Sequence, residues 1–162
     1  MWLVGLVDYH GSRLLGLHRI AWPSTAAVIR VVERVFREHG TPVRLLTDNA
    51  SILCSETLEA YLRCHGVRHS RIRPAHPWTN GKIERLFRTF KETVFRYIWV
   101  FTSLRQLDRW SADFVRYYNR DRPHGSYGGL TPDEVAAGAS EPSPARRRVT
   151  YFDGHLHWCA FG

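Results

Sequence analysis

The sequence predicts an α/β domain with a mixed β-sheet covered by helices on both faces. Two apolar strands joined by a tight turn predict an antiparallel hairpin, and two successive helix–strand units follow it. Because strands joined through a helix normally run parallel, the hairpin and these units together predict a mixed sheet. The chain has 162 residues, of which 44% are hydrophobic, enough for one globular domain with a real core.

The hairpin strands are expected at Trp2–Asp8 and Leu14–Ile20, with a turn over Tyr9–Ser12. Both runs are apolar along almost their whole length, rather than alternating between apolar and polar residues. This composition is typical of strands in a sheet that helices cover.

The remaining elements follow from apolar spacing, capping residues and helix-breaking residues. Gly40 and Pro42 end the first helix, and the two prolines of Pro74–Asn80 require a loop. The expected elements are a helix from Ser24 or Thr25 to about His39, a strand Val43–Thr47, a helix from Ser55 to about His65, a strand Val67–Ile72, a helix from Lys82 to about Trp99, and a helix Leu104–Tyr118 capped by Ser103.

The composition changes after Gly138, where Ala, Ser, Pro and Arg dominate. We therefore expect a domain over residues 1–138, a linker over 139–148, and the start of a C-terminal β segment over 149–162. The last segment has a strand–turn–strand pattern but is too short for a core of its own.

The net charge of +8 favours a polyanionic partner, because Lys and Arg side chains near phosphates release condensed counterions.

The chain has three cysteines, an odd number, and no two of them form a CxxC pair. This argues against a disulfide framework or a cysteine zinc site at Cys54, Cys64 and Cys159. No membrane span is expected, since the apolar run Trp2–Val7 is too short. A reducing cytoplasm is the simplest compartment.

Two carboxylates have the placement that a metal-dependent phosphodiester site needs. Asp48 ends an expected strand, Glu84 lies near the start of an expected helix, and 35 residues separate them. Side chains at a strand end and on a following helix can converge on one cation. Mg²⁺ prefers oxygen ligands, and two metal ions can stabilise the attacking and leaving oxygens of a phosphodiester.

The motifs around these residues resemble the integrase catalytic core of bacterial insertion-sequence transposases, which is related to retroviral integrases. Thr47–Asn49 and Asn80–Arg85 match the segments of the second and third acidic residues of this Asp-Asp-Glu family. Tyr118–His124 and Leu130–Pro132 resemble the C-terminal signature of the bacterial branch. The likeness runs from about Trp2 to Ala137.

The resemblance implies a ribonuclease-H-like fold and Mg²⁺- or Mn²⁺-dependent hydrolysis and strand transfer on DNA. It implies that Asp48 and Glu84 are catalytic metal ligands, and it makes Arg85, Arg88 and Lys91 candidates for DNA phosphate contacts. A solvated basic helix face is the alternative for the three basic residues. The family also implies transposon-end and target DNA as partners, a homo-oligomer, and a location at the bacterial nucleoid.

The family's first Asp lies on a strand that precedes the match to Trp2–Val7, so we expect the chain to lack it. Asp8 is the alternative first ligand, but it matches the family's next strand, and we favour a turn role. That missing strand is central in the family's sheet, so its absence should impair metal binding. We expect one of three outcomes: the sheet closes up, another chain or the C-terminal strand fills the gap, or the domain is poorly stable.

Ala50 is a second departure, because the family has Gly after the Asp-Asn pair. If this residue needs a positive φ, alanine strains the loop.

Several other residues have both a functional and a structural interpretation. His76 and Trp78 could stack on a base or pack the loop, and packing is favoured for Trp78. Arg122 and His124 are expected to be structural, and Arg146–Arg148 is either a DNA patch or a solvated linker.

Three functions remain open from sequence alone. The first is an enzyme core impaired by the missing ligand, the second a non-catalytic DNA-binding fragment, and the third a decayed transposase fragment. A nuclease of the ribonuclease-H or resolvase type is a further alternative in the same fold. It would need a fourth carboxylate, and none has suitable spacing.

Overall fold

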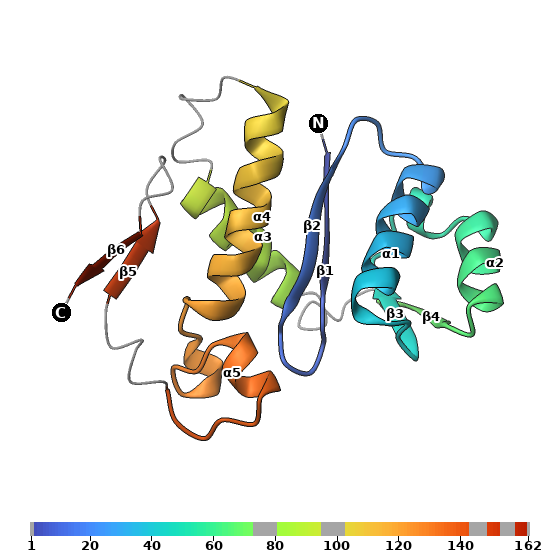
Figure 1. Cartoon of the computed structure of the whole chain (residues 1–162). Helices are drawn as coiled ribbons and strands as arrows, with labels where there is room; N and C mark the ends of the chain where they lie inside the picture. The colour runs from blue at the N-terminus through green and yellow to red at the C-terminus, as the bar shows by residue number, and fades with distance from the viewer. Residues whose placement is uncertain (1, 73–80, 95–102, 143–148, 153–157, 162) are drawn as a thin grey trace. The chain divides into compact units, whose positions relative to one another are not determined.

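The structure is a computed structural model, and it describes residues 2–72, 81–94, 103–142, 149–152 and 158–161. The backbone divides into two compact units, Met1–Gly5 with His18–Glu84, and Leu6–Leu17 with Arg85–Gly162. The hairpin of β1 (Trp2–Val7) and β2 (Leu14–Ile20) contributes residues to both units (Figure 1).

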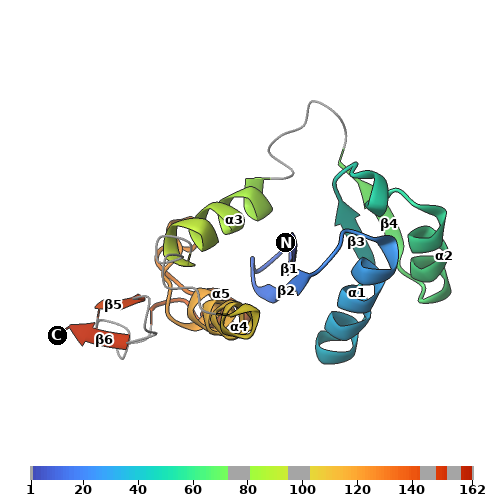
Figure 2. The same ribbon diagram turned by 90° about the horizontal axis from the view of Figure 1, so that it is seen from above.

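The first unit contains two capped helices and a parallel strand pair. Its further elements are α1 (Thr25–His39), β3 (Arg44–Thr47), the short 3-10 helix η1 (Ser51–Leu53), α2 (Glu56–Cys64), β4 (Arg68–Arg71) and the first residues of α3 (Gly81–Val94). β3 and β4 run parallel in register Arg44↔Arg68 to Thr47↔Arg71, and Figure 2 shows them side by side, near α1 and α2.

α1 forms where the sequence predicts it. The Ser24 side chain accepts a hydrogen bond from the Ala27 N–H at 3.2 Å, which satisfies one of the free donors of the first turn. Gly40 ends the helix at φ 87°, a left-handed value that favours glycine. The buried stripe consists of Ala27, Val28, Val31, Val32, Val35 and Phe36.

The second unit packs its helices around aromatic residues. It contains most of α3, then α4 (Leu104–Arg120), the 3-10 helix η4 (Gly125–Tyr127), α5 (Pro132–Ala136) and the antiparallel pair β5 (Val149–Phe152) and β6 (Trp158–Phe161). Phe90 of α3 and Phe114 of α4 are fully buried, and their rings meet edge to face at 5.0 Å. α4 runs two residues beyond the predicted end, to Arg120.

The described strands lie in separate pairs and not in one continuous sheet. They form three two-stranded sheets, β1–β2, β3–β4 and β5–β6. In the described residues the hairpin does not pair with β3 or β4. The sequence predicts a gap of one strand between them, so this separation agrees with the expected sheet. β5 and β6 pair with each other and not with the other strands, so the C-terminal strands do not fill the expected gap.

Two apolar strands are incompletely covered. No residue of β1 or of β3 is buried, whereas β2 buries Leu14, Leu17 and Ile20. Val43, just before β3, is 71% exposed. Apolar strands with unpaired edges are surfaces on which a further strand can pair.

None of the helices in the described parts of the chain combines the length and the apolar character needed to cross a bilayer. The predicted loop Pro74–Asn80, the predicted helix end near Trp99 and the basic run Arg146–Arg148 lie outside the described residues.

Candidate active site

Asp48 follows the last residue of β3, as the sequence predicts. One carboxylate oxygen, Oδ1, accepts a hydrogen bond from the Ala50 N–H at 3.0 Å, and the residue is exposed. This is an Asx turn, which holds the carboxylate against the start of η1. Within the described residues Oδ2 has no hydrogen-bond partner, so one oxygen remains available to a ligand.

Both neighbours of Asp48 are tied to β4. The Thr47 carbonyl accepts a hydrogen bond from the Ile72 N–H at 2.9 Å. The Asn49 side-chain amide donates to the Ile72 carbonyl, also at 2.9 Å. These two bonds extend the pairing of β3 and β4 by one residue beyond Arg71.

The Thr47 side chain is fixed by a polar cluster from β4 and α2. Its hydroxyl lies 2.9 Å from Nε2 of His69, whose side chain is only 9% exposed. Glu59 of α2 lies 3.9 Å from Nδ1 of His69 and also forms an ion pair with Arg71. α2 therefore supports the end of β3 through His69.

The pKa of His69 is lowered, first by burial and then by the neighbouring Arg71, with Glu59 acting in the opposite direction. In the unfolded chain His69 titrates near 6.5, so below this pH the unfolded chain binds more protons than the folded chain. We expect the free energy of unfolding to be highest above pH 6.5 and to decrease as the pH falls below it.

Urea unfolding at pH 7.5 and at pH 5.5 measures this effect. The wild type should lose more stability between the two pH values than the non-titrating variant His69→Gln. An equal loss in both proteins would place the pH dependence elsewhere.

Ala50 does not strain the loop. Its φ is −60° and its ψ is 137°, an extended conformation that any residue adopts. The strain considered from the sequence required a positive φ, which this position does not have. Alanine is therefore compatible with the turn after Asp48.

Glu84 lies in the first turn of α3 and is exposed. Arg88 and Lys91 follow at helical spacing i+4 and i+7, so the three side chains share one stripe of the helix. Arg85 is also exposed, and the opposite side of α3 is buried through Leu86, Thr89, Phe90 and Val94. Arg88 makes no ion pair with any described residue, so the i+4 pair with Glu84 considered from the sequence is not present.

The metal assignment of Asp48 and Glu84 stays a prediction. In the described part of the chain, no group of three or more His, Cys, Asp or Glu side chains could hold a metal ion. His76 and Trp78, the residues predicted to stack or to pack in the active-site loop, lie outside the described ranges.

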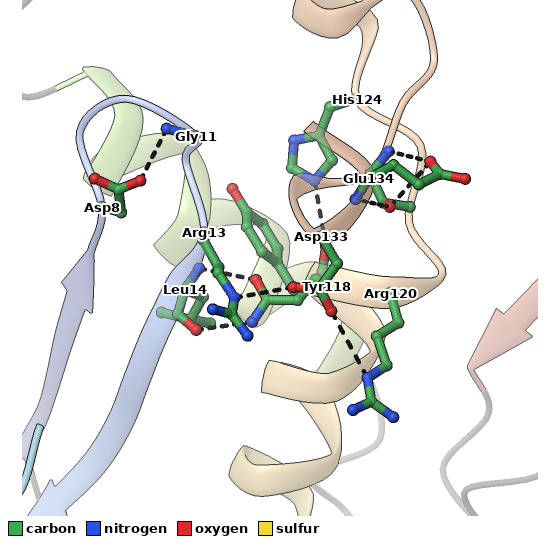
Figure 3. Close-up of polar contacts among 11 residues, drawn as sticks. Asp8, Gly11, Arg13, Leu14, Tyr118, Arg120, His124, Asp133 and Glu134 are labelled. Carbon is green, nitrogen blue, oxygen red and sulfur yellow. Dashed lines mark hydrogen bonds and ion pairs between the residues drawn. The ribbon is translucent and has the colours of Figure 1, made fainter. Parts of the chain in front are cut away.

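Asp8 is a turn residue in the structure. Its carboxylate accepts a hydrogen bond from the N–H of Gly11 at 2.9 Å (Figure 3). It accepts another from the N–H of His10 at 3.3 Å. Its own N–H donates to the Arg13 carbonyl at 2.8 Å. Both carboxylate oxygens therefore hold the turn between β1 and β2, which supports the structural interpretation over the catalytic one.

The last turn of α4 and the segment after it hold this hairpin turn in place. Asn119 makes two buried bonds to Leu14: its Oδ1 accepts from the N–H, and its Nδ2 donates to the carbonyl, each at 2.8 Å. The Tyr127 hydroxyl lies 2.7 Å from Oγ of Ser12. Asp133 pairs with Arg13 at 2.9 Å (Figure 3). We call Asn119, Tyr127 and Asp133 the hairpin anchor.

Arg122 and His124 support the same segment from inside. His124 is buried and packs edge to face on Tyr118 at 4.7 Å, and the Arg122 guanidinium lies 5.8 Å from the centre of the Tyr118 ring. The structural role predicted for these two residues agrees with these contacts. The sequence signature marked this segment, but it did not reveal the partners of Asn119 and Tyr127, because those are more than a hundred residues away.

Two family models, both described as integrase core domain, match residues 1–77 and residues 65–132. Together they cover the β3 exit, the start of α3, and Asn119 and Tyr127 of the hairpin anchor. The chain belongs to the integrase core family. This confirms the resemblance seen in the motifs.

Integrase core relatives include proteins of bacterial insertion elements. The chain is 35% identical over 114 residues to a 39.2 kDa protein of insertion element IS476 from Xanthomonas euvesicatoria, covering 70% of this chain and 33% of the relative. It is 30% identical over 110 residues to a 31.7 kDa protein of IS407 from Burkholderia multivorans, covering 68% of this chain and 39% of the relative. The match thus spans between a third and two fifths of the length of these relatives.

Solved integrase structures have the same fold. The catalytic core of HTLV-2 integrase in complex with magnesium, in its dimeric form, matches with a TM-score of 0.66 and 17% identity, covering 82% of each chain. A chain of the simian T-cell lymphotropic virus intasome in complex with the PP2A regulatory subunit B56 gamma matches with a TM-score of 0.72 and 16% identity, covering 93% of this chain and 54% of that one. The predicted ribonuclease-H-like fold class is confirmed by this likeness.

Proposed function

We propose that this integrase core takes part in metal-dependent cleavage and strand transfer of DNA ends, as a polynucleotidyl transferase of the Asp-Asp-Glu type. The observation that carries the proposal is the pair Asp48 and Glu84. Both are exposed carboxylates within the matched family segments, one at the exit of β3 and one in the first turn of α3.

The residues present fit a hard divalent cation, Mg²⁺ or Mn²⁺. Such ions prefer carboxylate oxygens and keep several waters, so they need few protein ligands. Asp48 meets this requirement, because its Oδ2 accepts no hydrogen bond from the described residues while Oδ1 is held by Ala50. A bound cation would supply charge stabilisation at the reacting phosphate. The chain's own task is to hold Asp48 and Glu84 in position.

We propose that a third carboxylate and a further strand come from a segment outside this sequence. The support is the incomplete burial of the apolar strands β1 and β3 and their lack of pairing to each other. The relatives from insertion elements are also much longer than this chain. On this proposal the chain alone has strongly impaired activity. A non-catalytic DNA-binding fragment, or one without function, is the alternative.

The test is a Mn²⁺-dependent strand-transfer assay on DNA ends, with this chain alone and with an extended version to which the proposed additional segment has been joined, called the longer protein below. We expect activity in the longer protein and little or none in the chain alone. If neither is active but the chain binds DNA in a salt-dependent manner, the proposal is wrong and the non-catalytic alternative holds.

We propose DNA as the partner of the exposed basic residues on α3, Arg85, Arg88 and Lys91. Removing one side chain that neutralises a phosphate should reduce the slope of log affinity against log salt by about 0.9. We therefore expect the double variant Arg88→Gln, Lys91→Gln to lower that slope by about 2 in a fluorescence-anisotropy titration.

The matched control is Arg30→Gln, Arg34→Gln on α1. These arginines are also exposed, lie on neighbouring turns of their helix as Arg88 and Lys91 do, and form no ion pair within the described residues. The control variant should bind DNA like the wild type. An equal change in slope would show that net charge, and not the face of α3, determines binding.

The remaining organisation is proposed from the sequence boundaries. Residues 1–138 form the core, 139–148 a linker and 149–162 the start of a β segment; α5 ends at Ala136, and the positive φ of Gly138, 74°, follows it. We propose a homo-oligomer at the bacterial nucleoid. A solved relative, the HTLV-2 core, occurs in dimeric and trimeric forms.

A further inference from the structure

Ile72 is held by the two residues that flank Asp48. Thr47 accepts a hydrogen bond from the Ile72 N–H, and Asn49 donates one to the Ile72 carbonyl, both at 2.9 Å. The residues on both sides of Asp48 are therefore bonded to Ile72, and these two bonds join the end of β3 to the end of β4. The two bonds fix the backbone on both sides of Asp48, the proposed metal ligand.

The two bonds differ in what they require from the sequence. The bond from Ile72 to Thr47 joins two backbone groups, so most residues at position 47 could make it. The bond from Asn49 needs a side-chain donor of the right length directly after Asp48. Asn49 is exposed, so this bond contributes little to stability in water. A polar bond of this kind at the edge of the proposed site is better explained by positioning than by folding.

The bond also reaches the end of the other strand. Ile72 directly follows β4, and its carbonyl accepts the bond from the Asn49 side chain. The same side chain thus constrains the backbone next to Asp48 and the backbone at the end of β4.

We propose that Asn49 is a positioning residue of the metal site, which holds Asp48 in a binding-competent direction by tying its backbone to Ile72. This inference rests on the proposed function, because it assigns a task to Asn49 in that same site. The expected consequence is specific: loss of the amide donor weakens metal binding at Asp48 and leaves the fold intact. Partners that orient ligands typically change metal affinity by about 10- to 100-fold, and an exposed partner belongs at the lower end of that range.

The test is a Mn²⁺ titration followed by NMR on the ¹⁵N-labelled chain, because bound Mn²⁺ broadens nearby amide signals. In the wild type we expect the signals of Asp48 and Ala50 to broaden first. In Asn49→Ala we expect about tenfold more Mn²⁺ to be needed for the same broadening. The urea unfolding midpoint should not change. In the longer protein, the Mn²⁺ concentration for half-maximal cleavage should rise by a similar factor, with unchanged affinity for DNA.

The matched control is Ser51→Ala, in the same loop. Ser51 is exposed, and in the described residues its hydroxyl makes no hydrogen bond. This variant should titrate like the wild type. The proposal is overturned if Asn49→Ala needs no more Mn²⁺ than the wild type, if Ser51→Ala shows the same shift, or if Asn49→Ala lowers the unfolding midpoint by more than Ser51→Ala does. If Mn²⁺ does not broaden the Asp48 region of the isolated chain, the same titration is made with the longer protein, and no broadening there overturns the proposal.

The two proposals can fail separately. If Mn²⁺ binds at Asp48 and depends on Asn49, but the longer protein neither cleaves nor transfers DNA, the proposed function is wrong and the positioning role stands. If cleavage requires Asp48 and Glu84 but is indifferent to Asn49, the proposed function stands and the positioning role is wrong.

Discussion

We expect Glu84→Gln to lower the rate of Mn²⁺-dependent strand transfer by roughly a thousandfold in the longer protein. Gln has the same shape but no charge, so it cannot neutralise a divalent cation. Losing about 4 kcal/mol of the charge stabilisation that a bound metal gives the transition state corresponds to this factor. Glu84 is exposed in the first turn of α3, so the fold should tolerate the change. Unfolding midpoints measured alongside the rates verify this point.

The matched control is Glu92→Gln. Glu92 lies on the same helix and is exposed, and the same charge is removed. A general electrostatic effect on DNA binding would change both variants alike. If Glu92→Gln loses as much activity as Glu84→Gln, or if Glu84→Gln stays within about tenfold of the wild type, Glu84 is not a metal ligand.

Helix starts were predictable from the sequence because they depend on local chemistry. Ser24, Ser55 and Ser103 each cap a helix by accepting a hydrogen bond from a backbone N–H three residues later. A capping side chain and its partner lie within one turn, so a short window of sequence contains the whole interaction. The place of Asp48 at the end of β3 follows in the same way, from an apolar strand that stops at a polar turn.

The contacts around Asp48 were not predictable, because they depend on register. Whether Asn49 reaches Ile72, or Thr47 reaches His69, is decided by how β3 and β4 align, and a shift of one residue would reverse the faces of the side chains. The strain considered at Ala50 fails for a related reason. Residue type limits the backbone angles that are allowed, but it does not say which of them a loop needs.

The sheet shows where an apolar pattern gives an incomplete answer. The runs in β1 and β3 predict burial, yet the structure buries no residue of either strand. An apolar strand is stable when other elements bury its side chains. The strand's own sequence does not say which elements do so. This incomplete burial is the observation on which our proposal of a further strand rests.

The hairpin anchor gives the largest stability effect that we expect. Leu14 is 1% exposed, and both its N–H and its carbonyl bond to the Asn119 side chain. Asn119 is itself buried, so in Asn119→Ala water cannot easily replace the amide. Each buried group left without a partner costs about 1–3 kcal/mol, so we expect a loss of about 3 kcal/mol, measured as a lower urea midpoint.

The same substitution at an exposed asparagine isolates the effect of burial. Asn49 also bonds to a backbone carbonyl through its side-chain amide, but in solvent. Asn49→Ala should therefore change the free energy of unfolding by no more than about 0.5 kcal/mol, the usual range for surface substitutions. If both variants lose the same amount, removing an asparagine side chain is destabilising wherever it lies. If Asn119→Ala is as stable as the wild type, the bonds to Leu14 do not hold the hairpin to α4.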